Sequence, residues 1–237
     1  MSQNNIDPVT FLQDRVLYED NHLIVVNKRA GEIVQGDQTG DKPLLEHVRD
    51  FIRVKYNKPG NVFCGLVHRI DRPVSGAVIF AKTSKALSRM NEMVKNRHIQ
   101  KFYWAIVQGR PDKLENNLQN YIFRNERLNK SFISEVEKQG WQRAELNYST
   151  LASSDRYSLL EVELLTGRHH QIRAQLSAMG CPIKGDLKYG AKRSNEDGSI
   201  CLHARRLVFE HPVSHENIKI EARPFNALFL KILDESK

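Results

Sequence analysis

The chain has 237 residues, with 36 Lys and Arg against 28 Asp and Glu, so its formal net charge is +8. This charge favours a polyanionic partner, either nucleic acid or an acidic membrane surface, although a merely basic soluble protein is an equal alternative. Apolar runs such as 23–26 and 77–81 are too short to cross a bilayer, and residues 1–15 lack the pattern of a signal peptide. We therefore expect a soluble, cytoplasmic protein.

The N-terminal part of the domain predicts two short strands and a helix. β-prone residues at 16–18 and 23–26 are separated by a polar turn. Over 44–56 the apolar residues recur at helical spacing, and Pro59-Gly60 ends the pattern. The spacing predicts an amphipathic helix.

A polar loop follows between two buried strands. Apolar residues at 66–68 and 77–81 predict the strands, and the stretch HRIDRPVSG at 68–76 joins them. Such a loop can present a reactive side chain.

The rest of the chain predicts an alternation of helices and strands. In order, these are a helix capped at Thr83 or Ser84, strands at 101–108 and 157–165, a helix after Gly167 with Gly180 as its cap, strands at 202–209 and 218–222, and a helix from Asn226. Strands outnumber helices and short turns join them, which favours an α+β domain with a mixed, largely antiparallel sheet. We expect one domain over 16–237, preceded by a polar extension over 1–15.

The HRIDR segment at 68–72 places Asp71 between two arginines. Each nearby positive charge favours the ionised carboxylate, so Asp71 is a candidate nucleophile or base. The alternative is a turn or capping aspartate that is paired with a neighbouring arginine.

The segment TGRHHQIR at 166–173 gathers two arginines and two histidines at a turn and the start of a helix. This arrangement suits a phosphate or carboxylate partner, and the alternative is a solvated basic helix end. Cations are mildly unfavourable early in a helix, so Arg168 and Arg173 indicate a distant or external anion. A guanidinium that holds a carboxylate bidentately is one explanation.

The strand KFYWAIV at 101–107 places Tyr103 and Trp104 on opposite faces. Either face can belong to the core. An aromatic side chain that borders a nucleic-acid site can stack on a base that has left its helix, and a packed core aromatic is the alternative.

Cofactor motifs are missing from the sequence. Three cysteines are present without paired spacing: Cys64, Cys181 and Cys201. They favour reduced thiols over a disulfide framework. Cys201 is near His203, and His169 adjoins His170, but no two-pair metal-ligand spacing appears. Since there is also no Gly-rich phosphate loop, we expect no metal and no nucleotide cofactor.

Taken together, these segments resemble the RluA-type branch of the RNA pseudouridine synthases. GLVHRIDRPVSGAVIFAKT at 65–83 is similar to that family's catalytic signature, and KFYWAIVQG at 101–109 is similar to its tyrosine-bearing strand. Residues 165–190 and 202–212 resemble two later motifs of the family. Four motifs in the family's order make the resemblance specific, and it spans nearly the whole chain. Only about fifteen residues precede the first strand, so we expect no N-terminal S4 RNA-binding module.

The resemblance implies the pseudouridine synthase catalytic fold, with a central RNA-binding cleft. It makes Asp71 the catalytic aspartate, Tyr103 the tyrosine against the target base, and Arg173 the ion-pair partner of the aspartate. Leu202 is implied to pack in the floor of the site. The residues implied to contact RNA are His68, Arg69, Arg72, Arg168, His170 and Gln171.

Three positions depart from the family pattern. Ile70 replaces the usual Leu, Val74 stands where Thr is common, and Gln175 stands where His is common. The last two changes remove a hydroxyl beside the catalytic loop and a ring from the helix. They put substrate positioning, more than activity, in doubt.

The implied function is site-specific isomerisation of uridine to pseudouridine in structured rRNA or tRNA, after the base is flipped out. Asp71 acts either as a nucleophile or as a base. RNA is the expected partner, and a monomer is the default. A non-catalytic RNA-binding module and a uracil-releasing glycosidase are the rival functions, although a glycosidase usually needs a second carboxylate.

Overall fold

Eleven strands pair into one sheet in the computed structural model, which describes residues 7–234. The strands are β1 (Val16–Glu19), β2 (Leu23–Lys28), β3 (Gly65–Leu66), β4 (Ser75–Ala81), β5 (Gln100–Gln108), β6 (Glu115–Asn125), β7 (Lys130–Ser134), β8 (Gln142–Ser153), β9 (Tyr157–Leu164), β10 (Leu202–Glu210) and β11 (Asn217–Glu221). Their order is β1-β2-β4-β10-β5-β9-β8-β6-β7, with β3 on β4 and β11 on β10. Among these described strands only β4 and β10 pair in parallel, so the predicted mixed, largely antiparallel sheet is confirmed.

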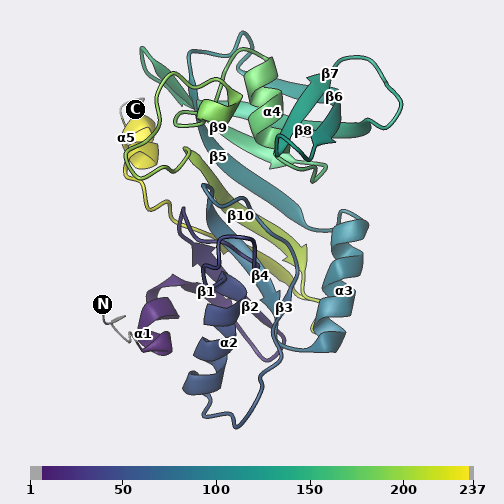
Figure 1. Cartoon of the computed structure of the whole chain (residues 1–237), viewed down its shortest axis with the longest axis vertical. Helices are drawn as coiled ribbons and strands as arrows, with labels where there is room; N and C mark the ends of the chain where they lie inside the picture. Colours follow the sequence, from purple (N-terminus) through teal and green to yellow (C-terminus); the bar gives the residue numbers. More distant parts are fainter. Residues whose placement is uncertain (1–6, 235–237) are drawn as a thin grey trace.

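Helices cover the two halves of this sheet. They are α1 (Pro8–Leu12), α2 (Leu44–Lys55), α3 (Ser84–Lys95), α4 (Gln171–Ala178) and α5 (Leu228–Asp234), with 3-10 turns η1 (Gln13–Arg15) and η2 (Leu187–Tyr189). Strands β5 and β10 run between the half that holds α2 and α3 and the half that holds α4 (Figure 1). None of the described helices has both the length and the apolar character needed to span a membrane.

Most of the elements lie where the sequence predicts them. The predicted helix over 44–56 is α2, and Thr83 caps α3 by accepting a hydrogen bond from the backbone of Ala86. The helix after Gly167 begins later than predicted, at Gln171. The prediction that Arg168 lies in an early helical turn is therefore wrong, because Arg168 is in the loop before α4.

The segment predicted as a polar extension, 1–15, contributes to the core in its described part. Helix α1 packs on α2, and the Leu12 side chain is fully buried. Arg15 is also buried and forms a 2.6 Å ion pair with Glu32. Over 7–15 this segment therefore belongs to the folded domain, while 1–6 lie outside the described residues.

The parallel contact between β4 and β10 depends on one glycine. Gly76 has φ +119°, and a Cβ atom there would lie 2.4 Å from the backbone N and O of Ala204. Only a residue without a side chain allows the two backbones to come this close. The contact lies at the start of β4, where Ser75 pairs with His203 and Gly76 with Ala204, directly after Asp71 and its loop.

Candidate active site

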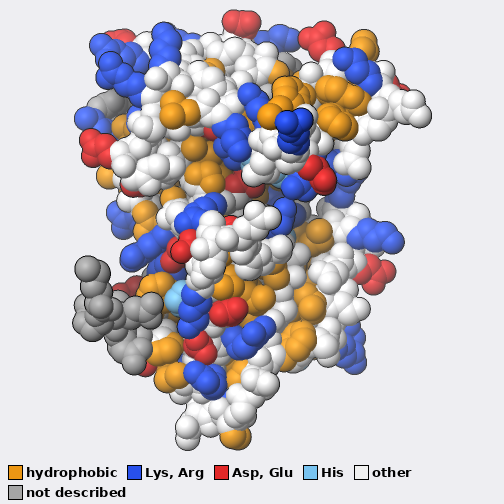
Figure 2. Space-filling model, in the orientation of Figure 1, with side chains coloured by type: hydrophobic (Ala, Val, Ile, Leu, Met, Phe, Trp, Pro, Cys, Tyr) orange, Lys and Arg blue, Asp and Glu red, His pale blue; other side chains and the backbone are white. Residues whose placement is uncertain are grey.

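A cleft of about 490 Å³ lies between the two halves of the sheet. Among the described residues that line it, Asp71 is the one carboxylate, and six side chains are Lys or Arg: Arg69, Lys95, Arg97, Lys101, Arg168 and Arg173. Figure 2 shows Lys and Arg side chains around the waist of the molecule on this face. The charge and concave shape fit a polyanion that offers one group to Asp71.

A buried lysine holds the loop that carries Asp71 by hydrogen bonds to backbone carbonyls. Lys28, at the end of β2, is fully buried, and its Nζ donates hydrogen bonds to the carbonyls of Arg29, Glu32 and Arg72 at 2.9, 2.7 and 3.1 Å. The carbonyl of Asp71 accepts from the backbone of Val74 at 3.0 Å, which closes a turn. This support leaves the Asp71 side chain 32% exposed toward the cleft.

Arg173 bridges two carboxylates. Its Nε and Nη2 donate to the two oxygens of Asp186 at 2.7 and 2.9 Å, and its Nη1 donates to Asp71 Oδ2 at 3.1 Å. Burial lowers the pKa of Arg173, but the hydrogen bonds and charges of Asp186 and Asp71 outweigh it and raise the pKa. The predicted ion pair with Asp71 is thus present in the structure, and a second, unpredicted carboxylate orients the guanidinium.

His170 also contacts Asp71, although the sequence placed it among the RNA contacts. Its Nε2 lies 3.4 Å from Asp71 Oδ2, and its Nδ1 lies 3.0 Å from the hydroxyl of Tyr189. Burial, followed by the charge of Arg173, lowers the pKa of His170 to about 2. The imidazole is therefore neutral at physiological pH.

Tyr103 and Leu202 form part of the wall of the cleft. Both side chains are buried and line the space beside Asp71, on the neighbouring strands β5 and β10. Burial, together with the charge of Asp71, raises the pKa of Tyr103, so its hydroxyl stays protonated. The structure brings the three residues with implied catalytic roles, Asp71, Tyr103 and Arg173, to one cleft.

The basic residues predicted to bind RNA divide into two groups. Arg69 is exposed and Arg168 is half-buried, and both line the cleft. Arg168 Nε donates to the carbonyl of Arg143 at 3.1 Å. Arg72 is not in the cleft lining, because it turns away to a 2.6 Å ion pair with Asp41.

His68 lines the cleft in its neutral form. Burial lowers the pKa of this histidine to about 3, and its Nε2 accepts a 3.3 Å hydrogen bond from the backbone of Ile79. The proton of the neutral ring is therefore on Nδ1. His68 can donate one hydrogen bond from Nδ1 without adding charge.

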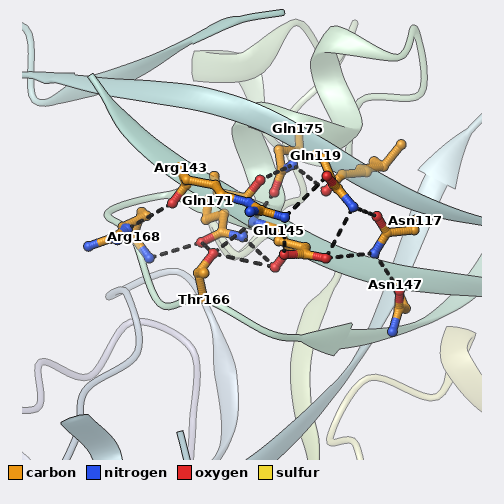
Figure 3. Close-up of polar contacts among 11 residues, drawn as sticks. Asn117, Gln119, Arg143, Glu145, Asn147, Thr166, Arg168, Gln171 and Gln175 are labelled. Atoms are coloured by element: carbon orange, nitrogen blue, oxygen red, sulfur yellow. Dashed lines mark hydrogen bonds and ion pairs between the residues drawn. The ribbon is translucent and has the colours of Figure 1, made fainter. Parts of the chain in front are cut away.

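Gln171 is buried, and its amide is engaged within the protein (Figure 3). Its Oε1 accepts from the Thr166 hydroxyl at 2.8 Å and from the backbone of Arg168 at 3.0 Å. Its Nε2 donates to the Glu145 carbonyl at 3.1 Å and to Gln175 Oε1 at 3.0 Å. These contacts use both amide donors and both acceptor lone pairs, so the Gln171 amide holds the turn at the place where the residue lines the cleft.

Gln175, one of the departures from the family pattern, continues this network away from the cleft. Its Nε2 donates to Asn120 Oδ1 at 2.8 Å and to the Leu118 carbonyl at 3.2 Å, both on β6. Gln175 does not line the cleft. Its effect on the site therefore passes through Gln171 to the turn that carries Arg168.

Sequence reasoning assigned no role to Lys28, Lys101, Asp186 or Tyr189. The last two lie in the segment GDLKYG at 185–190, which carries part of the resemblance. The family motif in that segment was therefore the feature of the sequence that could have marked both residues as part of the site. No motif marked Lys28 or Lys101. Lys28 stands out because it is fully buried, and Lys101 because it lines the cleft. Within residues 7–234, no group of three or more His, Cys, Asp or Glu side chains is placed to hold a metal ion.

Comparisons with known proteins agree with this geometry. Residues 22–178 match the family model for RNA pseudouridylate synthase. An uncharacterised RNA pseudouridine synthase of Synechocystis is 36% identical over 92% of this chain and 67% of that protein. The ribosomal large subunit pseudouridine synthase C of Haemophilus influenzae is 33% identical over the same shares. The solved structure of human RNA pseudouridylate synthase domain containing 4 has a TM-score of 0.80 at 22% identity, over 95% of this chain and 94% of that one, and shows the same fold. The chain belongs to the RNA pseudouridine synthase family.

Proposed function

We propose that this enzyme isomerises uridine to pseudouridine at defined positions of a folded rRNA or tRNA, with Asp71 as the catalytic carboxylate. The observation that carries the proposal is the position of Asp71. It is the one carboxylate among the described residues that line the cleft, and the guanidinium of Arg173 pairs with it at 3.1 Å. Ribosomal RNA is the first substrate to test, because a relative at 33% identity is named for the large ribosomal subunit.

The reaction needs only one bond exchanged for another. The C1′–N1 bond breaks, the uracil turns, and C1′ bonds to C5, while the proton leaves C5 and N1 gains one. Ionised Asp71 serves either as a nucleophile or as the base that removes the C2′ proton of the sugar. Both routes need the carboxylate that Arg173 stabilises, and neither needs an oxidant or an energy source.

The cleft favours a uridine that has left its stack. Extrusion costs a few kcal/mol and is easiest in loops and bulges. Phosphate contacts from Arg69, Arg168 and Lys101 offset this cost, because all three line the cleft. The ring of Tyr103, beside Asp71, supports the detached uracil while it turns.

The rival functions make different demands on this site. A uracil-releasing glycosidase would use a second carboxylate for acid-base chemistry, and the described lining of the cleft contains Asp71 alone. A module that only binds RNA would have no use for the buried Arg173 and Asp186 behind the aspartate. Both features favour the synthase.

Chemical mapping of pseudouridine tests the proposal. Total RNA from cells with and without the gene identifies sites that vanish, and a transcript of such a site is then treated with purified enzyme. We expect Asp71→Asn to abolish turnover and to retain RNA binding. Asp50→Asn, on α2 outside the cleft, is the matched control and should be fully active.

Three outcomes would contradict the proposal. A fully active Asp71→Asn enzyme would remove the catalytic role of the aspartate. Release of free uracil would favour the glycosidase. The absence of any vanished site in both rRNA and tRNA would exclude the proposed substrates.

A further inference from the structure

The two oxygens of Asp71 have different surroundings. Oδ2 faces Arg173 Nη1 at 3.1 Å and His170 Nε2 at 3.4 Å. Oδ1 forms no hydrogen bond with any residue of the described range 7–234. An ion pair between Arg173 and Asp71 does not by itself explain why His170 contacts the same oxygen, Oδ2.

The proton on the His170 ring can be placed from its neighbours. The ring is neutral because burial and Arg173 disfavour its charge, so one nitrogen carries hydrogen and the other is an acceptor. Nε2 faces an anionic oxygen, and a lone pair there would repel it. Nε2 therefore carries the hydrogen, and Nδ1 must accept one.

Tyr189 provides the hydrogen that Nδ1 requires. The backbone N–H of Ser131 donates to the Tyr189 hydroxyl at 2.7 Å, so the tyrosine oxygen already accepts. Its own hydrogen is free to point at His170 Nδ1, 3.0 Å away. Hydrogen bonds thus run from β7 through Tyr189 to His170, and His170 Nε2 in turn contacts Asp71 Oδ2 at 3.4 Å.

The backbone at His170 has an unusual conformation that accompanies this ring position. His170 has φ +53°, in the left-handed region, immediately before α4. Non-glycine residues seldom adopt this conformation, and they keep it only where the surroundings require it. The ring stacks on His169 with centroids 3.8 Å apart and meets the edge of Tyr189. Arg173, three residues later, reaches the same oxygen from the first turn of the helix.

We propose that His170 is a positioning residue that, with Arg173, holds Oδ2 of Asp71 so that Oδ1 is the oxygen presented to the uridine. Tyr189 selects the tautomer in which His170 can do this. The inference rests on the proposed function, because it names which oxygen of the catalytic carboxylate meets the substrate.

Tyr189→Phe tests these contacts by removing one hydroxyl. We expect the single-turnover rate at saturating enzyme to fall at least about tenfold, with the Kd for the RNA transcript unchanged, because orientation is lost and binding is not. Long-range ¹H–¹⁵N NMR spectra should show hydrogen on His170 Nε2 in the wild type and a mixture of tautomers in the variant. Tyr148→Phe is the matched control, since its hydroxyl donates to the Lys113 carbonyl away from the cleft, and it should change neither readout.

A second pair of variants separates positioning from folding. His170→Gln retains an N–H near the position of Nε2, so it should recover most of the rate that His170→Ala loses. An unchanged rate in Tyr189→Phe, hydrogen on Nδ1 in the wild type, or a Gln variant no better than Ala would each overturn the inference. The tautomer needs no turnover, so hydrogen on Nδ1 would overturn the inference even if the wild-type enzyme made no pseudouridine, and the two failures are distinguishable.

Discussion

Asp186 holds Arg173 with two hydrogen bonds, of 2.7 and 2.9 Å, and leaves its third nitrogen to Asp71 at 3.1 Å. The Asp186 side chain is 1% exposed, whereas that of Asp71 is 32% exposed. The buried carboxylate therefore fixes the plane of the guanidinium, and the exposed one remains available for chemistry. The arginine stays charged at any pH at which the protein is folded.

Asp186→Asn should weaken both the fold and the reaction. Removing the buried carboxylate leaves the Arg173 charge only partly compensated, by Asp71, so we expect the free energy of unfolding to fall by about 3 kcal/mol. The single-turnover rate should fall at least about tenfold, because the guanidinium is no longer oriented toward Asp71. Urea denaturation and transcript turnover measure the two effects.

Glu221→Gln is the control for this prediction. It breaks the half-exposed 2.8 Å pair with Arg205 and should cost less than about 1 kcal/mol. Equal losses in the two variants would contradict the role given to Asp186.

The pairing of Asp71 with Arg173 could be predicted, but from the motifs rather than from local chemistry. The two residues are 102 positions apart, and the local sequence around Asp71 also fitted a turn or capping residue paired with a neighbouring arginine. Four motifs in a fixed order supplied the missing information. The contact of His170 with Asp71 could not be predicted, because it depends on a left-handed backbone before α4.

Strands β6 to β8 were not predicted from the sequence. On β8 the buried residues Ala144, Leu146 and Tyr148 alternate with polar ones, but on β6 polar side chains interrupt the apolar alternation. On β6 the side chain of Asn117 is exposed, and Asn120 on the other face meets the amide of Gln175 in place of an apolar core. Without these strands, nothing in the sequence indicated that the Gln171 amide is engaged within the protein, and the resemblance implied that it contacts RNA. Its burial depends on Glu145 of β8, which only the tertiary structure places beside it.

Lys101→Met should weaken RNA binding without destabilising the free enzyme. Lys101 lines the cleft, burial lowers its pKa, and it forms no ion pair with residues 7–234. The partly buried ammonium group of Lys101 is therefore placed to contact a phosphate of the bound RNA. We expect the slope of log K against log salt to fall by about one in magnitude.

Titration of labelled RNA at several salt concentrations measures this slope. Lys85→Met, on the exposed surface of α3 and outside the cleft, should leave the slope unchanged. An unchanged slope in Lys101→Met would show that this lysine does not contact phosphate.

Gly76→Ala should disrupt the junction of β4 and β10. The added Cβ would lie 2.4 Å from the Ala204 backbone, and φ is +119°. Steric overlap and backbone strain together should cost at least about 3 kcal/mol of unfolding free energy. Gly109→Ala separates the two causes, because Gly109 has φ +79° and open space around it. It should lose only about 1–2 kcal/mol, and a similar loss at both glycines would mean that the close approach is unimportant.

Because Lys28 is buried, we expect the free energy of unfolding to depend on pH between the pKa of Lys28 in the folded protein and its pKa in the unfolded chain. Burial lowers the pKa of Lys28 in the folded protein to about 7, from 10.5. Between these values the unfolded chain binds the proton that the folded chain has released, so stability rises with pH. For one proton the slope approaches about 1.4 kcal/mol per pH unit.

Urea denaturation between pH 7 and pH 9 should therefore show the wild type gaining stability relative to Lys28→Met as the pH rises. Lys55→Met is the control, because the hydrogen bond to Glu19 raises the pKa of Lys55 and its titration lies above this window. The Lys55→Met and wild-type curves should be parallel from pH 7 to pH 9. If the Lys28→Met curve were parallel as well, Lys28 would stay charged in the folded state, because its three carbonyl partners would then offset the burial of the charge.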